Sequence, residues 1–464
     1  MKWKSRMFIY MVLLLLGTAC TLKYDKWLQK MQIFNQEHLD VSIPEFDHRL
    51  ISFKTDLKAT DIQLKFERGS VRNYLTKNEA IEEVANLFDQ LEYNYGMYTY
   101  YGKQQFDEAK AQILNQIMSF NNRIEASNME NLYRQALFFI KDQHFLIGKK
   151  ALYEKEAIYY NDTILLEKKG VEYFLKVANE RVLKIESDQT EISLTNHVKR
   201  VINDEGVINY QIVVTGKKPD MLTLQLENNV IMDVPLKQYV ETHINQYESF
   251  AYDWIDSGRI PILRIDEFRD INDHKMTAMI QGVSKIKNSS ILFLDLRNNR
   301  GGFGFTASRL LEQLIGRMPA SKGIQIQKLS MFKENLNQSN YEKNGFDTSQ
   351  QDFWIKYPQK ELDKNDRILI VLMNRNTSSA AEGVIDSLHS LENTVFVGVN
   401  SSGMIASSAS FPILTLYSEV SILYGSNIRL YDDSYFKEYR GFEPDIYYFG
   451  NKNLETLILA FLNV

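Results

Sequence analysis

The sequence is poor in cysteine and proline, and it has no strongly basic segment beyond its first residues. Its single cysteine excludes an intramolecular disulfide bond and a metal cluster held by several thiolates. With eight prolines and 12% aromatic residues, long disordered linkers are not expected. A formal net charge of −5 disfavours nucleic acid as a partner. No His-Glu-x-x-His motif, repeat or low-complexity segment occurs. These absences disfavour a metallopeptidase, and we expect no cofactor.

The overall composition is that of a globular protein with more than one domain. Hydrophobic residues make up 44% of the chain and charged residues 24%. A chain of 464 residues exceeds what one hydrophobic core usually supports, so two or three domains are expected.

The N-terminus has the features of an export signal. Three basic residues within the first six precede the apolar stretch Met7 to Leu16 and the small residues Gly17 to Ala19. Cys20 follows directly, and the arrangement resembles the lipobox of bacterial lipoproteins, although leucine is commoner than Gly17 at that position. We expect residues 1–20 to be a lipoprotein signal peptide, with the mature chain anchored through a lipid on Cys20 to the bacterial membrane, outside the cytoplasm. An ordinary cleaved signal, which gives a secreted protein, is the alternative.

The first half of the chain changes from a helical to an extended pattern. In residues 21–150, apolar side chains recur at helical spacing over Asn78–Leu91, Asp107–Phe120 and Ser127–Ile140. Between two of these helices lies a cluster of five tyrosines, which packing between helices explains better than a binding face. From 151 to 235 the pattern predicts short strands and one amphipathic helix, Leu194–Ile202, which together suggest a small β-barrel or sandwich.

From about residue 250 onward, strands and helices alternate. Apolar runs predict strands at Ile260–Ile265, Ile291–Leu296, Ile368–Met373, Val395–Val399 and Ile413–Leu416. This alternation is typical of an α/β domain with helices covering a largely parallel sheet. The polar stretch from about 319 to 366 interrupts the pattern and is interpreted as a lid or a substrate-facing insertion.

One stretch, Arg367 to Glu382, combines a buried strand with a helix start. The apolar run Ile368–Met373 is typical of a strand buried on both faces, and the polar residues that follow favour a turn. A serine at this junction, such as Ser379, is raised out of the core beside the free N–H groups of the helix, which suits a nucleophile. The alternative is that the serines there only cap the helix.

A second stretch, Ile291 to Gly304, has a strand, paired glycines and then a helix. Gly301 and Gly302 let backbone N–H groups face a concave site without interference from side chains. The glycine spacing does not fit a dinucleotide fingerprint, and no Gly-Lys-Ser/Thr follows as in a phosphate-binding loop. A cradle for an oxyanion or a carboxylate is the better chemical interpretation.

These motifs together resemble the C-terminal processing (tail-specific) serine peptidases and their tricorn-core relatives. The resemblance rests on Asp295-Leu-Arg-Asn-Asn-Arg-Gly-Gly302, Asn376-Thr-Ser-Ser-Ala-Ala-Glu382 and Gly441-Phe-Glu-Pro-Asp445, and it covers about 250 to 450. It implies a multidomain chain of the α+β and α/β classes. The expected parts are a helical N-terminal domain (21–150), a PDZ-like β module (151–235) and a crotonase/ClpP-like α/β catalytic domain (250–464).

The resemblance also implies roles for individual residues. Ser379 matches the nucleophile, and the backbone amides of Ala380 and of Gly301 or Gly302 match the oxyanion hole. The tail-specific branch activates its serine with a lysine, but this chain has Met404 at that position, and methionine cannot accept a proton.

The tricorn-like branch instead uses a histidine and a glutamate, which here match His144 as base and Glu438 as the residue that orients it. That branch has a serine beside its histidine where this chain has Gln143. Among the other histidines, His389 is the main competitor as base. It lies ten residues after Ser379 on the same predicted helix, about 15 Å along it, which is too far to reach the serine.

The chemistry of these groups supports a hydrolase. A serine hydroxyl needs a positioned base at neutral pH, and a histidine can take its proton and return it to the leaving amine. We therefore expect a serine endopeptidase that acts on exported proteins or peptides. A catalytically inactive relative that binds peptides or assembles with envelope proteins is the alternative, and a hydrolase of other esters or amides uses the same groups. The PDZ-like module either captures peptide C-termini, with Lys168–Val171 as its loop, or is a structural spacer.

Overall fold

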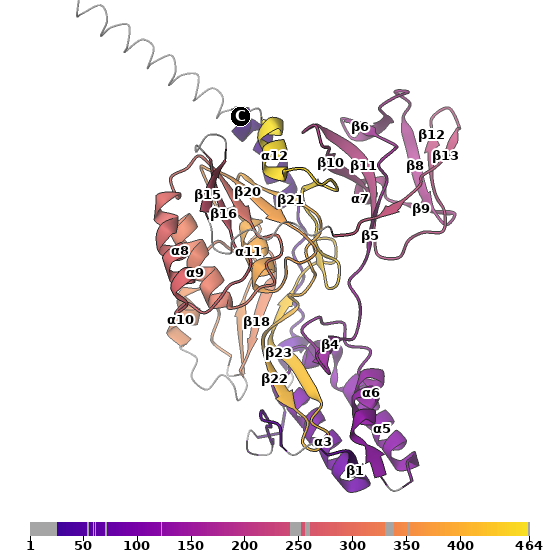
Figure 1. Cartoon of the computed structure of the whole chain (residues 1–464), viewed down its shortest axis with the longest axis vertical. Coiled ribbons are helices and arrows are strands. Elements are labelled where there is room, and N and C mark those ends of the chain that lie inside the picture. Colours follow the sequence, from indigo (N-terminus) through magenta and orange to yellow (C-terminus); the bar gives the residue numbers. More distant parts are fainter. Residues whose placement is uncertain are drawn as a thin grey trace, which may run out of the picture.

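The computed structural model describes residues 26–52, 55–58, 60, 62–69, 72–121, 123–241, 252–255, 260–329, 338–350 and 352–462. The expected signal peptide and Cys20 lie outside these residues. None of the helices described there is both long and apolar enough to cross a bilayer. The chain forms three masses, which are a helical one, a β module and an α/β domain (Figure 1). The prediction of a mixed α+β fold is confirmed.

The helical part consists mainly of α3 (Lys77–Asn94), α5 (Lys103–Ser119) and α6 (Ala126–Ala136). The helix α3 begins at a capping box, in which Thr76 and Glu79 exchange side-chain and backbone hydrogen bonds. All three predicted helices are confirmed, with ends that differ by a few residues. Tyr95 and Tyr98 are buried, so packing explains at least these members of the tyrosine cluster.

The α/β domain has three layers around a parallel sheet. Its central strands are β16 (Ile260–Arg264), β17 (Ile291–Asp295), β20 (Ile368–Met373), β21 (Thr394–Gly398) and β26 (Ile446–Tyr447), paired in that order. Alternate residues of β20 face different cores, because Leu369 and Val371 pack with one set of helices and Ile370 and Leu372 with another. Burial on both faces explains the uninterrupted apolar run.

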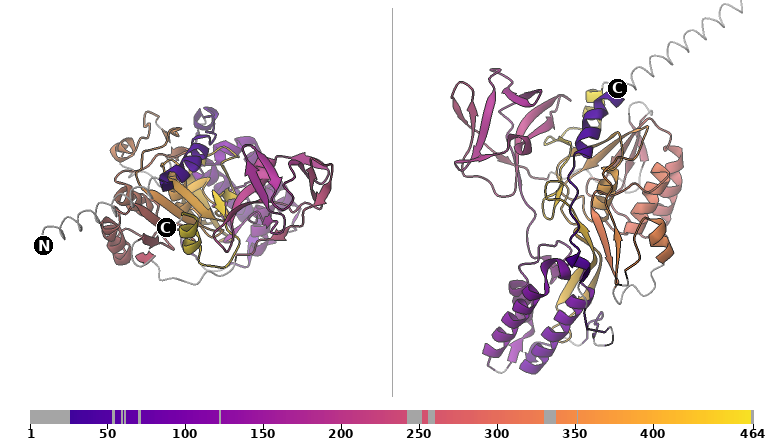
Figure 2. Two further views of the ribbon diagram at one scale, coloured as in Figure 1. Left: turned by 90° about the horizontal axis from the view of Figure 1, so that it is seen from above. Right: turned by 180° about the vertical axis from the view of Figure 1, so that it is seen from behind.

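Different parts of the chain supply the two covering layers. One face is covered by α8 (His274–Gly282), α9 (Gly304–Ile315) and α11 (Ala380–Leu388). The other is covered by α12 (Leu454–Leu462) and by the N-terminal helix 26–39, whose Met31 and Phe34 are buried there. These two helices lie side by side (Figure 2), and Lys30 donates a hydrogen bond to the Phe461 carbonyl (2.6 Å).

A second, six-stranded sheet joins the helical part to the α/β domain. It contains β19 (Phe353–Lys356), β18 (Ile324–Lys328), β23 (Ser421–Leu430), β22 (Ser407–Leu414), β3 (Leu146–Ile147) and β4 (Lys150–Ala151). The interpretation of 319–366 as a lid or insertion is therefore wrong for β18 and β19, whose side chains Ile326 and Phe353 are buried in the sheet. The strand predicted at Ile413–Leu416 begins earlier, at Ser407. The hairpin of β22 and β23 extends to the helical part (Figure 1) and shares its core.

The β module packs a separate small sheet against strands of the large sheet, around one apolar core. Its main strands are β5 (Ile158–Tyr160), β6 (Leu166–Lys169), β7 (Glu172–Leu175), β8 (Val182–Ser187), β10 (Val198–Ile202), β11 (Ile208–Thr215) and β12 (Leu222–Leu226). Because β10 pairs in parallel with β26 at Val201 and Tyr447, the module continues the central sheet of the α/β domain. Lys168–Val171 forms the tight turn of the β6–β7 hairpin, and Val171 is exposed.

The helix predicted at Leu194–Ile202 is wrong in its second half. The described segment is a single helical turn, α7 (Leu194–His197), followed by strand β10. Val198 and Val201 are β-branched and are buried in the sheet, where β10 lies between β11 and β26. Pairing with these strands therefore overrides the local helical pattern.

Candidate active site

The turn between β20 and α11 holds Ser379 in a strained conformation. Ser379 has φ 56° and ψ −118°, a region that non-glycine residues rarely adopt. Such a conformation costs about 1–3 kcal/mol and persists only where its surroundings enforce it, most often at functional sites. A serine on a sharp strand-to-helix turn is also the arrangement that exposes the nucleophile in α/β-hydrolases. The cap interpretation is thus incomplete, since a helix cap does not need this strain.

Neighbouring segments enforce the turn through hydrogen bonds. The Ser378 amide donates to the Asn299 carbonyl (2.9 Å), and the Thr377 hydroxyl donates to the Leu296 carbonyl (2.8 Å). These contacts join the turn that carries Ser379 to the glycine loop, which lies after the adjacent strand β17. Because both loops follow neighbouring parallel strands, they meet at the same edge of the sheet.

His144 is brought to Ser379 by the strand that follows it. The ends of the hydrogen bond, His144 Nε2 and Ser379 Oγ, are 3.1 Å apart. Directly after His144, strand β3 pairs with β23 through Leu146 and Leu423, which fixes the loop from the helical part against the α/β domain. A histidine nitrogen at this distance can accept the hydroxyl proton, provided that the ring carries its own proton on Nδ1.

The surroundings of His144 favour the neutral ring. Burial lowers the pKa of His144, the Asp142 carboxylate and the Ser407 backbone raise it, and Arg429 lowers it further. The net shift is downward, so the ring stays unprotonated at neutral pH and is able to act as a base.

Glu438 lies close to His144 but does not contact its ring. Its Oε1 accepts the amide of Gln143 (2.9 Å) and its Oε2 accepts the amide of Ala406 (3.1 Å). Within the described part of the chain, Nδ1 of His144 has no hydrogen-bond partner. The direct bond expected between Glu438 and the imidazole is therefore not formed, and Glu438 holds backbone on both sides of the histidine instead. Burial, and next the charge of Asp142, raise the pKa of Glu438 well above its ordinary range.

Gln143 stands where the tricorn-like branch has serine. Its side-chain amide donates to the Ser402 carbonyl (3.0 Å). Gln143 therefore links the histidine loop to the loop after β21, and its side chain acts on backbone.

The glycine loop lies directly against Ser379. A side chain on Gly301, which has φ +95°, would place a Cβ 2.7 Å from Ser379 Cβ and 3.0 Å from the Ala380 amide nitrogen. Gly302, with φ +121°, meets the Phe268 carbonyl in the same way at 2.1 Å. Glycine is thus required at both positions for this close approach.

The two expected oxyanion donors in this loop differ in availability. The Gly301 amide donates to its own neighbour Asn299, at the side-chain Oδ1 (2.9 Å). The bridge to Phe268 uses the Gly301 carbonyl and the Phe303 amide, so it leaves the Gly302 amide out. Of the pair, Gly302 is therefore the candidate donor, together with Ala380 at the start of α11.

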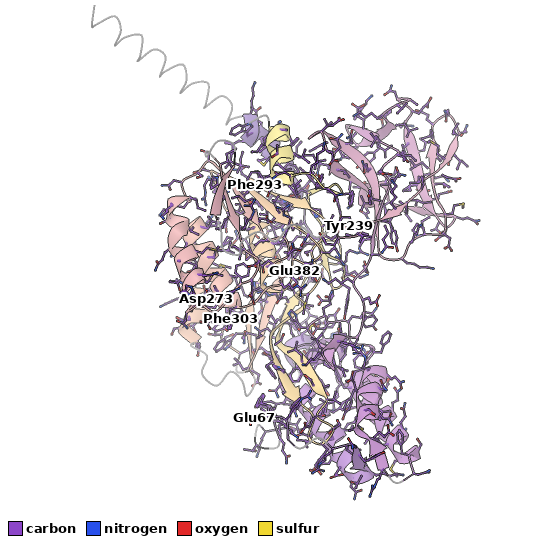
Figure 3. The ribbon with its side chains drawn as sticks, viewed as in Figure 1. Glu67, Tyr239, Asp273, Phe293, Phe303 and Glu382 are labelled. Atoms are coloured by element: carbon purple, nitrogen blue, oxygen red, sulfur yellow. The ribbon has the colours of Figure 1, made fainter. Side chains whose placement is uncertain are left out.

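Glu382 has a role that the sequence reasoning missed. Its Oε1 accepts the Ser401 hydroxyl and the Gly403 amide (both 2.6 Å), and its Oε2 accepts the amides of Met404 (2.8 Å) and Ser379 (3.1 Å). The fully buried carboxylate, labelled near the centre of the molecule in Figure 3, joins the turn that carries Ser379 to the loop after β21. The Ser-x-x-Glu spacing of a capping box was the available signal. At Met404 it is the backbone amide that makes this contact.

Arg375 also has a role that the sequence did not suggest. Its guanidinium donates to the carbonyls of Ser401, Arg440, Glu156 and Tyr439 and is almost fully buried. Five donors in a rigid fork allow one side chain to collect several carbonyl groups. Arg375 therefore joins the turn that carries Ser379 to the segment that carries Glu438.

The remaining histidines of the α/β core have structural partners. His389 lies at the end of α11, where its Nδ1 contacts the Ile385 carbonyl (3.0 Å) and its ring stacks on Phe396 (3.8 Å between centroids). Burial lowers the pKa of His389 to about 3, so it is neutral. His38 pairs with Asp445 of the Gly-x-x-Pro-Asp motif (3.0 Å). No group of His, Cys, Asp and Glu suited to a metal ion occurs among the residues that the structure describes.

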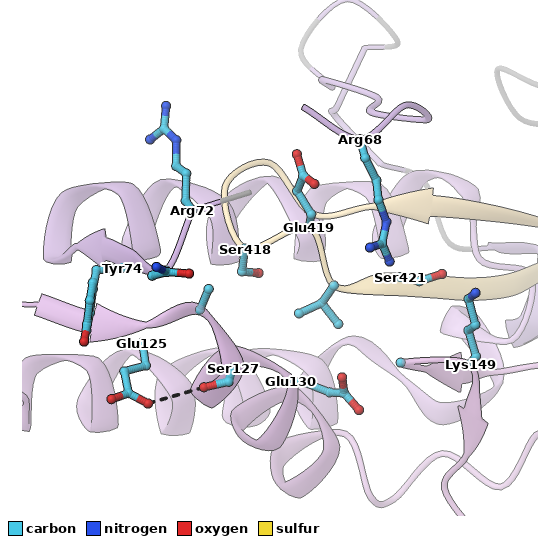
Figure 4. Close-up of a pocket in the computed structure, with 14 residues that line it drawn as sticks. Arg68, Arg72, Tyr74, Glu125, Ser127, Glu130, Lys149, Ser418, Glu419 and Ser421 are labelled. Carbon is cyan, nitrogen blue, oxygen red and sulfur yellow. Dashed lines mark hydrogen bonds between the residues drawn. The ribbon is translucent and has the colours of Figure 1, made fainter. Parts of the chain in front are cut away.

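A separate polar hollow of about 770 Å³ lies between the helical part and the tip of the β22–β23 hairpin (Figure 4). Arg72 on its rim pairs with Glu79 (2.6 Å), and Glu419 pairs with Lys65 (2.7 Å). Charges of both signs line it, and none of the candidate catalytic residues does.

Comparisons with known proteins agree with the motifs. Residues 259–448 match the family model described as peptidase family S41. A search of curated proteins finds no match. Mature CPAF with lactacystin is 12% identical (80% of this chain, 93% of that chain, TM-score 0.41), and a lipoprotein from Streptococcus agalactiae is 12% identical (83%, 95%, 0.39). The photosystem II D1 C-terminal processing protease is 13% identical (79%, 92%, 0.37).

The assignment rests on the family model, because these TM-scores are low. It covers the α/β domain, which contains Ser379, the glycine loop and Glu438, while His144 comes from outside the matched residues. The prediction of an enzyme of the peptidase class is confirmed at this level. Residues 259–448, in the α/β domain, are thus similar to peptidase family S41.

Proposed function

We propose that this chain is a serine endopeptidase with Ser379 as nucleophile and His144 as general base. The observation that carries the proposal is the 3.1 Å approach of His144 Nε2 to the hydroxyl of a serine held at positive φ. Two segments far apart in sequence supply these groups, and the glycine loop lies against the serine. A remnant site under no functional constraint has no reason to keep the strain at Ser379.

The proposed reaction follows from the positions of these groups. Ser379 Oγ attacks the carbonyl carbon of the scissile peptide bond while its proton passes to His144 Nε2. The oxyanion that forms accepts hydrogen bonds from the amides of Ala380 and Gly302, each worth about 3 kcal/mol in comparable sites. The imidazolium then gives its proton to the leaving amine, and a water molecule repeats the sequence to release the acyl group.

The substrates that we propose are exported proteins or peptides. The export signal and Cys20 support an enzyme anchored by lipid outside the cytoplasm, where such substrates are found. The family supports peptide bonds as the target. Met404 supports a mechanism without a lysine base, since a thioether cannot accept a proton.

A fluorophosphonate probe tests the proposal on the full chain. We expect labelling of the wild type, none of Ser379→Ala, and strong loss in His144→Ala. Ser378→Ala is the matched control, because this neighbouring serine contributes its backbone to the turn, and its labelling should equal that of the wild type. Cleavage of an unfolded protein such as casein should follow the same order. A folded wild type that takes up no probe would refute the enzyme and favour a peptide-binding relative.

A further inference from the structure

Glu438, the carboxylate expected to orient His144, makes no hydrogen bond to its ring among the described residues. Glu438 contacts backbone amides, and no carboxylate bonds to the imidazole ring among the described residues. Asp142 lies two residues before the histidine in the same loop and is fully buried. Its Oδ1 accepts the backbone amide of His144 (2.9 Å). Asp142 is thus attached directly to the residue whose protonation the reaction changes.

Tyr95 holds the other oxygen of Asp142. The phenol of Tyr95 donates to Asp142 Oδ2 (2.9 Å), and both groups are buried. The Tyr95 ring packs 5.2 Å from that of Phe145 and 6.0 Å from that of Tyr424, measured between centroids. Burial and the charge of Asp142 raise the pKa of Tyr95, so the phenol keeps its proton and remains a donor.

Lys328 on strand β18 holds the backbone at this point. Its Nζ donates to the carbonyls of Glu92 and Tyr95 at the end of α3 (2.8 and 3.3 Å). The tyrosine therefore has a fixed backbone as well as a packed ring. Both oxygens of Asp142 are held, and the carboxylate cannot turn away from the histidine loop.

Other charged groups also face His144, and their effects differ. Arg429 from β23 opposes a positive charge on the ring, and the Ser407 backbone from β22 favours it. Glu438 lies between strands β24 (Phe436–Lys437) and β25 (Gly441–Phe442). Burial and the charge of Asp142 raise its pKa, so it contributes less negative charge than a free carboxylate. Glu382 lies beyond Ser379, where four donors surround its oxygens. The charge of Asp142, in contrast, raises the pKa of His144, and its Oδ1 is bonded to the His144 amide.

We propose that Asp142 is the positioning residue that fixes His144 and stabilises its protonated form, that Tyr95 anchors Asp142, and that Glu438 supports the backbone around the histidine. This inference rests on the proposed function. Asp142 touches neither substrate nor the reacting atoms, and it acts through His144. The two contacts at its oxygens fix the loop, and its charge stabilises the imidazolium that forms when Ser379 loses its proton.

The test is the pH dependence of fluorophosphonate labelling in the full chain. In Asp142→Asn, the remaining oxygen can still accept the His144 amide, but the charge is gone. Since that charge raises the pKa of His144, its loss should move the acid limb of the labelling rate down by about one pH unit. The plateau rate should fall by up to about tenfold, because the imidazolium is less stabilised. A change of structure alone lowers the rate without moving the limb.

Two further variants keep the test decisive. Tyr95→Phe retains the aromatic packing and removes the donor to Asp142, so its acid limb should move in the same direction by a smaller amount. Glu438→Gln should leave the acid limb at its wild-type position, even where the rate falls. If Asp142→Asn does not fold, the position of the acid limb in Tyr95→Phe tests the inference. An acid limb unchanged in Tyr95→Phe, and in Asp142→Asn where it folds, overturns the inference, as does a shift in Glu438→Gln alone.

Different results would refute the peptidase activity and the role of Asp142. A wild type that is never labelled refutes the proposed peptidase activity itself. A wild type that is labelled in a pH-dependent way, with variants that leave the limb in place, refutes only the role of Asp142.

Discussion

Replacing Gly301 by alanine should disable the nucleophile turn through crowding. The new Cβ would lie 2.7 Å from Ser379 Cβ, 2.9 Å from the Ser378 carbonyl oxygen and 3.0 Å from the Ala380 nitrogen. Carbon atoms in contact normally stay about 3.5–4.0 Å apart, so the Ser379 side chain has to move by roughly 1 Å. Positive φ adds about 1–2 kcal/mol for an alanine, and overpacking adds about 1–3 kcal/mol. The free energy of unfolding should therefore fall by about 2–5 kcal/mol.

The effect on chemistry should exceed the effect on stability. A displacement of about 1 Å at a reacting group can lower the rate about 100-fold. Labelling of Gly301→Ala with a fluorophosphonate, compared with its urea unfolding curve, measures both quantities. Gly304→Ala is the matched control, because a Cβ there meets nothing within 4 Å and the residue begins helix α9. Its stability should stay the same or rise by up to about 1 kcal/mol, with labelling unchanged. A Gly301→Ala protein that matches the wild type in both measurements would refute the crowding argument.

Three other variants test separate contacts. Ser379→Gly should be more stable in urea unfolding than Ser379→Ala by about 1 kcal/mol, since glycine relieves the strain at positive φ, and equal stability would show that there is no strain. Burial lowers the pKa of His389 to about 3, so its ring is neutral in the folded chain and its contribution to stability is fully present above pH 6.5. Below pH 6.5 the unfolded chain binds a proton at this residue that the folded chain does not, so the free energy of unfolding should fall by up to about 1.4 kcal/mol per pH unit. His389→Phe should lose less stability between pH 6 and 4, and parallel curves would contradict this. Arg375→Lys should lower the free energy of unfolding by about 2–3 kcal/mol. A lysine ammonium has three donors and cannot donate hydrogen bonds to all four carbonyls that Arg375 contacts. A melting temperature equal to that of the wild type would contradict this role.

The strands that the sequence predicted well are those with one uninterrupted apolar pattern. Ile368–Met373 is apolar because both faces of β20 are covered, so every position of the strand is buried and requires an apolar side chain. The strand β23 was not foreseen because Gly425, Ser426 and Asn427 look like a turn. Gly425 is needed there because a Cβ would lie 2.5 Å from Ser407 Oγ of the paired strand. The strands β18 and β19 lie in a polar part of the sequence and were not predicted either. They form because β18 pairs with β23 and β19 pairs with β18.

At the site, sequence motifs identified residue types and tertiary structure decided their contacts. Ser379 and the glycine pair lie at junctions between strand and helix, which local patterns reveal. The contact between His144 and Ser379 joins residues 235 positions apart, and it depends on the pairing of β3 with β23. From sequence, Glu438 was expected to hold the imidazole ring, yet it reaches the neighbouring backbone, because the direction of a buried side chain follows from packing on all sides.

Local patterns of residues were enough to predict several elements. These are the apolar strands, the capped helices, and the serine and glycine turns that follow two neighbouring strands. Only the tertiary structure decided which loops meet at those turns, which carboxylate lies against His144, and how the β module continues the central sheet. The physical reason is the separation along the sequence of the residues that interact. Helical and extended patterns depend on residues a few positions apart, whereas hydrogen bonds such as those of Glu382, Arg375 and Asp142 depend on segments brought together by the whole fold.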